Sequence, residues 1–505
     1  MSGSEDASTT HPLDPAYLAE PLIEAVPGQL NPAVRNRYNL VVLGGGPVGL
    51  AIASNAAALG AKVAVVEKGK LGEITFRAGA VSTLALARAA RQAREIRRAG
   101  EFGIRGLADP QVDFAEVMRY VRAQAEEVAA RSGITVLLRR GIDVYEGEGK
   151  LLARTHIEVS GHELEFSRAV IATGSRPNIH PVPGLKESGY LTGDTLFTLA
   201  ELPRRLAIVG AGTLGCELAQ CFARLGSRVF VYDEKPRCLS NLDADAAEII
   251  RAALEHDGVT FRLGYHGLRI SRTEHERVVH AELDGKMFSD SCDHVLVAAG
   301  RIPMTDGLDL DAAGIRYDES GVWVNSFLRT TNLRVLAAGN VCSDFRYGQH
   351  ADTLARVVVA NALFYGSARL SGLRLPVCVF TDPEVAHVGL DQKTAEARRY
   401  RSMAFSLDNL ERALIEHSGA GLYKLYYDKH GRLRSAVIVA DHASELIGEL
   451  VTAMNQGVRL GAFASNAHPT PTLAEIIQAA GDGYRRNMIT PFMARFLRRL
   501  LSLRR

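Results

Sequence analysis

The chain has 505 residues, enough for roughly two to four domains. Its 47% hydrophobic and 23% charged residues are typical of a globular protein, and a net charge of +2 argues against a dedicated nucleic-acid-binding protein. No apolar run reaches the roughly 20 residues that cross a bilayer, and the polar, acidic start of the chain is unlike a secretory signal. Together with six scattered cysteines, these features favour a cytoplasmic protein.

The first informative segment follows a polar stretch, 1–37, which we expect to be a surface extension. Residues 39–42 are apolar, 43–49 are rich in glycine, and small residues fill 50–59. This order predicts a strand, a tight turn and a helix, after which a second strand ends at Glu67. The pattern is that of a dinucleotide-binding unit. Its glycines let the backbone approach a pyrophosphate, its helix N-terminus attracts the negative charge, and its acid accepts hydrogen bonds from a ribose.

The same pattern occurs a second time. Residues 206–208, 209–215 and 228–232 predict a strand, a turn opening a helix, and a second strand that ends at Asp233. Two such units imply two dinucleotides on one chain, for which a flavin and a nicotinamide are the natural pair. Asp233 favours NADH, because a 2′-phosphate would meet its carboxylate; Lys235 leaves NADPH open, and a plain turn residue is the alternative interpretation of Asp233. The expected dinucleotide-binding residues of the two units are Gly44, Gly46, Pro47, Gly49, Glu67, Lys68, Gly210, Gly212, Gly215 and Asp233.

Three other segments are predicted strands that run into small-residue turns, at 167–177, 294–303 and 333–340. A helix is expected over 353–363. Later in the chain, aromatic and β-branched residues flank a Lys-His-Gly turn, which predicts a hairpin over 423–439. Strand and helix patterns therefore alternate through most of the chain.

In this order and spacing, the segments resemble the flavoprotein disulfide reductases (class I pyridine nucleotide-disulphide oxidoreductases), which include dihydrolipoamide dehydrogenase and glutathione reductase. The resemblance covers about 38–475, and the segment 468–475 with Tyr484 and 490–492 is similar to mercuric reductase. It implies an α/β fold with two Rossmann-like domains, the NAD(P) domain being inserted in the FAD domain, and a C-terminal α+β domain that forms a two-fold homodimer. The implied boundaries are 1–37 for the extension, 38–185 and 301–370 for the FAD domain, 186–300 for the NAD(P) domain, 371–484 for the dimerisation domain and 485–505 for a basic amphipathic tail.

The resemblance also assigns cofactor-binding residues outside the two glycine loops. These residues are Ala172, Thr173, Gly174, Gly300, Arg301, Gly339 and Asn340. Asn340 stands where the family uses an aspartate on the ribityl chain of FAD, and its amide oxygen can still accept a hydrogen bond. Glu217 matches a family acid that lies near the flavin.

The redox-active cysteine pair of the family is missing. Thr75 and Ala80 stand at its two positions, and Leu84 replaces a lysine near the flavin N5. Neither Thr75 nor Ala80 can form a thiolate, so we expect no thiolate–flavin charge transfer. Thr75 remains a candidate site residue by position. Arg77 is a candidate source of positive charge near Glu217, and a solvent-facing arginine is the alternative interpretation.

A second departure from the family lies near the C-terminus. His468 takes the place of a structural histidine, Thr470 that of the acid–base histidine, and Glu475 that of its glutamate. Mercury reduction is not expected, because the C-terminal cysteines that would deliver mercury are missing too, and we expect no metal site. Cys216 and Cys221 have the spacing of the redox pair, but they follow the second glycine loop and are interpreted as small core residues.

The chain thus retains the residues that hold FAD and a nicotinamide and lacks those that reduce a disulfide. We expect an FAD-dependent NAD(P)H oxidoreductase that passes hydride from NADH to FAD and electrons to a non-disulfide acceptor. A quinone, oxygen, another nicotinamide or a partner protein would serve as acceptor. The alternative is a catalytically silent nucleotide-binding flavoprotein that acts as a sensor or scaffold.

The end of the chain predicts a separate helix. Thr490 can cap it and Pro491 suits its first position. From Phe492 to Leu501, large apolar residues recur on one side and arginines occupy the other. Such a helix can lie on an anionic membrane, which would place the protein peripherally at the inner membrane surface. The alternative is a helix packed on the dimer with solvated arginines.

Overall fold

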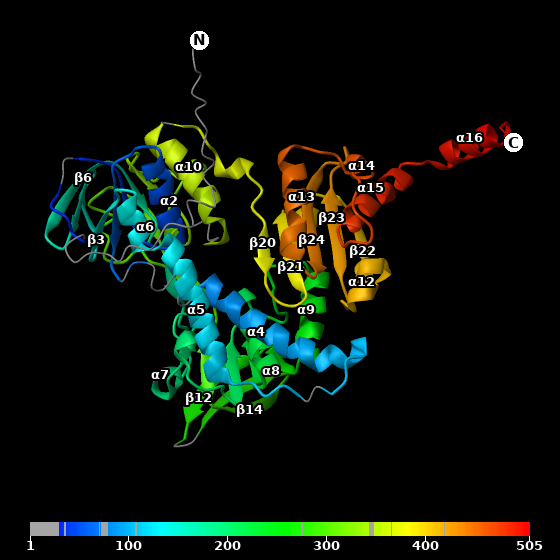
Figure 1. Cartoon of the computed structure of the whole chain (residues 1–505), viewed down its shortest axis with the longest axis horizontal. Coiled ribbons are helices and arrows are strands. Elements are labelled where there is room, and N and C mark those ends of the chain that lie inside the picture. The colour runs from blue at the N-terminus through cyan, green and yellow to red at the C-terminus, as the bar shows by residue number, and fades with distance from the viewer. Residues whose placement is uncertain are drawn as a thin grey trace, which may run out of the picture. The chain divides into compact units, whose positions relative to one another are not determined.

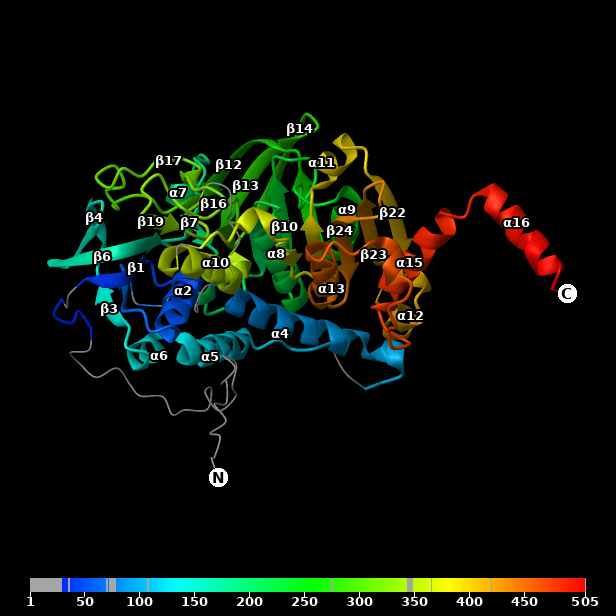
Figure 2. The same ribbon diagram turned by 90° about the horizontal axis from the view of Figure 1, so that it is seen from above.

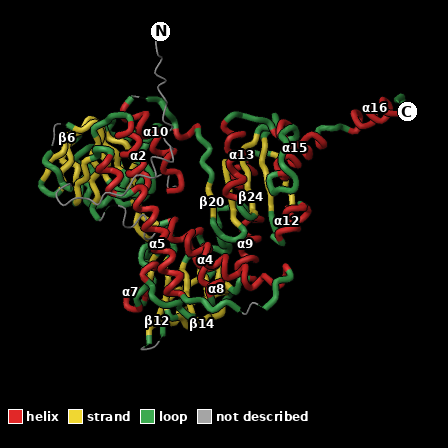
Figure 3. The backbone as a smooth tube through the Cα atoms, in the orientation of Figure 1, coloured by secondary structure: helices red, strands yellow, loops and turns green. Residues whose placement is uncertain are grey.

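The computed structural model describes residues 30–34, 37–69, 71, 79–106, 109–273, 276–342, 348–364, 366–418 and 420–504. Thr75, Arg77 and most of the N-terminal extension lie outside this set. The chain divides into two compact units. The first contains residues 1–77, 122–175 and 303–368, and the second contains 78–121, 176–302 and 369–505. Figure 1 follows the chain by colour, and Figure 3 separates helices from strands.

The first unit is built on a seven-stranded sheet with the order β3-β2-β1-β6-β5-β4, in which β19 also pairs with β6. Its central strands β2, β1, β6 and β19 pair with one another in parallel, as expected of a dinucleotide-binding sheet, whereas β5 pairs with β6 antiparallel. The strands are β1 (Tyr38–Leu43), β2 (Val63–Glu67), β3 (Asp143–Glu146), β4 (Lys150–Ala153), β5 (His156–Val159), β6 (His162–Ile171) and β19 (Val335–Ala337).

Two helices of this unit pack against each other, α2 (Pro47–Ala58) and α10 (Ala351–Leu363). Helix α2 has Pro47 at its first position, where the missing N–H leaves no hydrogen bond unmade. Its alanines are small enough for close packing, and the predicted helix over 353–363 is confirmed within α10. The strands β1, β2 and β6 and the segment 308–342 supply most residues of an apolar core in this unit, to which β3, β4 and β5 also contribute.

The second unit contains another parallel sheet, with the order β11-β10-β9-β15-β8, and a three-stranded antiparallel sheet, β12-β13-β14. Helix α8 (Thr213–Leu225) begins directly after the second glycine loop and ends at Gly226, which takes a left-handed conformation. The strands are β8 (Leu191–Thr192), β9 (Arg205–Val209), β10 (Arg228–Asp233), β11 (Val259–Leu263), β12 (His266–Arg272), β13 (Arg277–Leu283), β14 (Lys286–Cys292) and β15 (His294–Val297).

The C-terminal part of the second unit is a five-stranded sheet with the order β20-β21-β24-β23-β22, all antiparallel. The predicted hairpin is confirmed as β23 and β24. The helices α13 (Ala443–Asn455) and α15 (Glu475–Asn487) contribute to the same core. The strands are β20 (Val377–Val379), β21 (Glu384–Gly389), β22 (Arg401–Ser406), β23 (Leu422–Tyr427) and β24 (Leu433–Ala440). No helix among the described residues is both long and apolar enough to cross a membrane.

Helix α4 (Ala80–Arg98) packs along α8, as Figures 1 and 2 show from two directions. Apolar residues of both helices share one core with Val379, Val385, Val437 and Val439 of the C-terminal sheet. Helix α4, helix α8 and the C-terminal sheet are therefore joined by one continuous apolar core within this unit.

A buried charge cluster reinforces this contact. Asp382, between β20 and β21, has its carboxylate oxygen Oδ2 2.7 Å from Arg224 of α8 and 3.0 Å from Arg94 of α4. Arg91 of α4 lies 3.7 Å from the same oxygen. Gln220 of α8 accepts a hydrogen bond from the Asp382 backbone N–H at 2.7 Å and donates one to its carbonyl at 2.8 Å. Burial opposes ionisation of Asp382, but the three guanidiniums hold its pKa below the usual value.

Replacement of Asp382 by alanine should lower the stability of the protein by about 3 kcal/mol, because it removes the buried carboxylate shared by Arg224, Arg94 and Arg91 and leaves the buried Arg224 with Asp257 as its remaining carboxylate partner. Urea denaturation followed by fluorescence measures the effect. Glu116→Ala is the matched control, since it removes one partner of an exposed ion pair with Arg119 and should cost less than about 1 kcal/mol. Equal losses in the two variants would show that the cluster does not hold the layers together.

Candidate functional site

The strand register of the first unit brings three turns to one edge of the sheet. Leu43 at the end of β1 pairs with Ile171 of β6, which pairs with Ala337 of β19. The turns that follow these strands therefore emerge side by side at the carboxyl ends of the strands, where open α/β sheets bind their ligands. These turns contain Gly44, Gly46, Ala172, Thr173, Gly174, Gly339 and Asn340.

The first glycine loop is fitted closely to its surroundings. Gly44 has φ +109°, and a Cβ there would lie 2.5 Å from the Ala172 carbonyl oxygen. A Cβ on Gly49 would lie 1.9 Å from the Gly44 carbonyl oxygen. Gly46 precedes α2 as its N-terminal cap, so the first N–H groups of the helix face the loop. Only glycine permits this approach of loop, helix and strand.

The acid at the end of β2 is held against the loop. The two carboxylate oxygens of Glu67 accept hydrogen bonds from the Gly45 N–H at 2.6 Å and from the Gly69 N–H at 2.9 Å. Lys68 is directed elsewhere, since its Nζ lies 2.5 Å from Glu148 Oε1. Glu67 is thus oriented beside the helix N-terminus by two backbone donors.

Asn340 and Thr173 differ in their hydrogen bonding. The Thr173 hydroxyl donates to the Met304 carbonyl at 2.7 Å, and the Gly174 carbonyl accepts from the Met304 N–H at 3.0 Å, so this turn is held in place. The Asn340 side-chain oxygen is buried and has no hydrogen-bond partner among the described residues. An unpaired buried acceptor at the strand ends fits a donor supplied by a bound ligand, such as a ribityl hydroxyl of FAD.

The second glycine loop repeats the geometry of the first. Gly210 has φ +112°, and a Cβ there would lie 2.6 Å from the Ala298 carbonyl oxygen, while one on Gly215 would lie 1.9 Å from the Gly210 oxygen. Asp233 accepts hydrogen bonds from the Ala211 N–H at 2.8 Å and the Lys235 N–H at 2.9 Å. These distances match those at Glu67.

Space remains open in front of the second loop. A Cβ on Gly212, the cap of α8, would meet nothing within 4 Å, and neither would one on Gly300, which follows the end of β15. The guanidinium of Arg301 lies 3.1 Å from Asp194. A helix N-terminus that faces open space at the strand ends fits a pyrophosphate.

Glu217 is buried within α8 and accepts a hydrogen bond from the Phe380 N–H at 2.8 Å. Burial raises the pKa of this carboxyl to about 7, and the hydrogen bond from Phe380 opposes the shift only in part. Leu84 and Ala80 lie on α4, the helix that packs along α8. Neither can supply a positive charge to offset the carboxylate. Arg77 lies outside the described residues.

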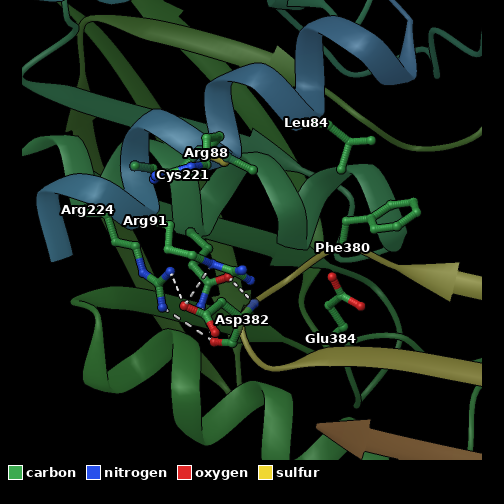
Figure 4. Close-up of a pocket in the computed structure, with 11 residues that line it drawn as sticks. Leu84, Arg88, Arg91, Cys221, Arg224, Phe380, Asp382 and Glu384 are labelled. Atoms are coloured by element: carbon green, nitrogen blue, oxygen red, sulfur yellow. Dashed lines mark hydrogen bonds and ion pairs between the residues drawn. The ribbon is translucent and has the colours of Figure 1, made fainter. Parts of the chain in front are cut away.

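A small pocket of about 180 Å³ lies between α4, α8 and the start of β21 (Figure 4). Leu84 and Phe380 form part of its apolar lining. Arg91 and Arg224 reach Asp382 on its other side. The sequence did not predict this pocket, because its polar groups come from segments far apart in the chain; of its lining residues, the sequence had drawn attention to Leu84 and Cys221.

The cysteines of α8 are core residues. Cys216 and Cys221 are both buried, and burial raises the pKa of the Cys221 thiol to about 12. The pKa of Cys216 is raised by a side-chain hydrogen bond with Cys238 and by burial. The structure therefore brings Cys216 together with Cys238, a contact that sequence spacing gave no reason to expect. Among the described residues, no cluster of three or more His, Cys, Asp or Glu side chains is arranged to hold a metal ion.

The C-terminal candidates belong to the antiparallel domain. His468 Nε2 lies 3.1 Å from Glu449 Oε2, and its Nδ1 is buried without a hydrogen-bond partner in the described structure. Thr470 is exposed, and Glu475 begins α15. His468 is thus anchored to α13, while Thr470 has no ionisable group to offer.

Comparison with known proteins places this geometry in a family. The sequence matches the family model "Pyridine nucleotide-disulphide oxidoreductase" over residues 38–362 and its dimerisation domain over residues 375–480. Similar curated proteins are the mercuric reductase of Bacillus cereus, 29% identical over 88% of this chain and 71% of the relative, and dihydrolipoyl dehydrogenase 3 of Pseudomonas aeruginosa, 32% identical over 89% of this chain and 99% of the relative. The chain belongs to the pyridine nucleotide-disulphide oxidoreductase family.

A solved structure supports the fold. The HOCl-induced flavoprotein disulfide reductase RclA from Escherichia coli has a TM-score of 0.76 at 24% identity, covering 88% of this chain and 99% of that chain. The expected fold of two Rossmann-type domains and a C-terminal dimerisation domain is confirmed, as is the assignment to an oxidoreductase family whose members bind FAD and NAD(P)H.

Replacement of Glu217 by glutamine should change how stability depends on pH. A carboxyl whose pKa is raised from 4.5 to about 7 stabilises the fold fully below its unfolded pKa, and this contribution is lost as the pH rises through 7. Glutamine keeps the acceptor for Phe380 and carries no charge. The variant should therefore gain about 3 kcal/mol relative to the unchanged protein between pH 5 and pH 8.

Urea denaturation at the two pH values measures this difference. Glu126→Gln, at an exposed position on α5 (Phe114–Ser132), is the control and should show no such gain. A Glu217→Gln profile parallel to that of the unchanged protein would contradict the raised pKa.

Proposed function

We propose that the protein is an FAD-dependent NAD(P)H oxidoreductase that takes hydride from NADH and delivers electrons to an acceptor that is not a disulfide. One observation carries the proposal: both glycine loops have the close backbone approach expected of a dinucleotide-binding unit, while Ala80 and Leu84 stand where the family resemblance puts a redox-active cysteine and a lysine. When bound, FAD would supply the two-electron chemistry between nicotinamide and acceptor. A quinone, oxygen, another nicotinamide or a partner protein are the acceptor classes that need no thiol.

Residues of both glycine-loop units would bind the two dinucleotides. Glu67 would hold the adenosine ribose of FAD, and the N–H groups after Gly46 would hold its pyrophosphate. Asn340 would accept a hydrogen bond from the ribityl chain. The matching contacts to the nicotinamide dinucleotide would come from Gly212 and Asp233, with the Asp233 carboxylate favouring NADH over NADPH.

Glu217 and the C-terminal residues would act nearer the reaction. With a pKa of about 7, Glu217 can take up or release a proton at neutral pH without a lysine partner. His468 would present its unpaired Nδ1, and Glu475 would lie at the start of the following helix. Thr75 and Arg77, which lie outside the described residues, stay proposed site residues on the basis of their sequence positions.

Anaerobic titration with NADH tests the hydride step. The purified protein should carry FAD, and NADH should bleach its absorbance without a long-wavelength charge-transfer band, because no thiolate stands beside the ring. Gly212→Val is the control: its side chain would fill the space open for the pyrophosphate, so bleaching should slow by at least about tenfold while FAD is retained. Flavin that NADH does not reduce would instead support a nucleotide-binding sensor or scaffold, and a charge-transfer band would contradict the proposal.

We also propose a cytoplasmic homodimer with the domain boundaries expected from the sequence. An exposed apolar patch in the second unit supports the dimer. Phe102 and Ile104 follow α4, while Leu414 and Ile415 lie on α12 (Glu411–Glu416). The two segments meet where the centroid of the Phe102 ring lies 5.2 Å from that of the His417 ring. The four apolar side chains of this patch are 48–61% exposed in the single chain. A partner subunit that covers the patch would remove it from water.

The oligomeric state can be measured by light scattering at micromolar concentration. The protein should have twice the mass of one chain, and the double substitution Leu414→Asp with Ile415→Asp should shift it toward the monomer, because two carboxylates would be buried in the interface. Leu333→Asp, at an equally exposed leucine of the first unit, should leave the dimer intact. A monomeric unchanged protein would contradict the proposal.

A further inference from the structure

We propose that helix α16 (Pro491–Ser502) binds the surface of an anionic lipid membrane and lies in the plane of the headgroups. The helix is formed by its own sequence. Thr490 caps it by accepting a hydrogen bond from the Met493 N–H at 3.2 Å, and Pro491 occupies the first turn. The start of the helix is therefore defined by its own residues, and at twelve residues it would gain stability from a surface that covers its apolar side.

The apolar side of α16 has no cover within the chain. No residue of the helix is buried, and Figures 1 and 2 both show it clear of the C-terminal domain. At about 100° per residue, the apolar side chains form one continuous face around roughly half of the helix. Their exposure runs from 40% to 84%, and they are Phe492, Met493, Phe496, Leu497, Leu500, Leu501 and Leu503.

The charge of this segment is of one sign. Arg495 and Arg498 lie opposite the apolar face, Arg499 lies at its edge, and no Asp or Glu occurs anywhere in 483–505. Arg504 follows the helix at its C-terminal end, where a long side chain can reach back to the headgroups. Uniform positive charge beside a broad apolar face matches an anionic lipid surface, which offers negative charge above and apolar chains below.

The length of the helix fixes how it would bind. Twelve residues rise about 18 Å, which is too short to cross the roughly 30 Å apolar core of a bilayer. The helix would therefore lie flat, with the arginines at the level of the phosphates. A peripheral attachment of this kind is independent of the proposed chemistry at the flavin.

Co-sedimentation of the full-length flavoprotein with vesicles tests the proposal. Binding should be strong on phosphatidylglycerol mixed with phosphatidylcholine, weak on phosphatidylcholine alone, and reduced by salt. The triple substitution R495Q, R498Q and R499Q should weaken binding on the order of 100-fold, because each arginine near an anionic surface contributes about a factor of five. The double substitution F496D and L500D should abolish it.

Met287→Asp is the control, since Met287 is 60% exposed on β14 and should not affect binding. Equal sedimentation of all variants, or none by the unchanged protein, would overturn the proposal. Conversion of the dimer to a monomer by F496D and L500D would also overturn it, because the apolar face would then cover a second copy of the chain. Flavin reduction by NADH should be unchanged in every variant, so failure here is distinct from failure of the proposed activity.

Discussion

The whole arrangement depends on the close approach of backbone segments at the ends of parallel strands. At Gly44 and Gly210 a loop passes so near a neighbouring carbonyl oxygen that a single methyl group would overlap it. This approach fixes where α2 and α8 begin, and therefore where their N-terminal N–H groups point. A larger residue would move the helix away from the strand ends and separate it from the acid that closes each unit. The two nucleotide units are thus positioned by steric constraint before any side-chain chemistry contributes.

Side chains then give the two halves of the molecule different characters. In the first unit Glu67 and Thr173 at the strand ends already make hydrogen bonds within the described structure, whereas the buried Asn340 side-chain oxygen has no partner there. In the second unit the important groups are buried charges. Among the described residues no counter-charge contacts Glu217, whereas Asp382 has three arginines around it. The same helix, α8, therefore carries a carboxyl that binds its proton tightly and contacts one that does not.

Local patterns were sufficient for much of this structure. Both glycine loops, their acids, the hairpin over 423–439 and the cap at Thr490 depend on residues close together in the chain, so the sequence predicted them correctly. The Asp382 cluster could not be predicted, because its arginines come from α4 and α8 and nothing local links them to β21. The contact of Cys216 with Cys238 has the same cause. The raised pKa of Glu217 could not be predicted from the sequence either, since it depends on how completely packing excludes water from the carboxyl group. The roles proposed for the individual site residues remain predictions.

The segment Phe380–Asp382 has a consequence for how assembly and chemistry are related. Phe380 donates the backbone hydrogen bond that Glu217 accepts, and two residues later Asp382 binds the arginines of α4 and α8. Both contacts are made by one short connection between strands of the domain whose family forms dimers. A displacement of this connection would weaken the hydrogen bond that favours ionised Glu217 and disturb the clamp on α4 at the same time. The pKa of Glu217 therefore depends on the same short connection that holds α4 and α8, and a substitution in this connection would change the acidity of Glu217.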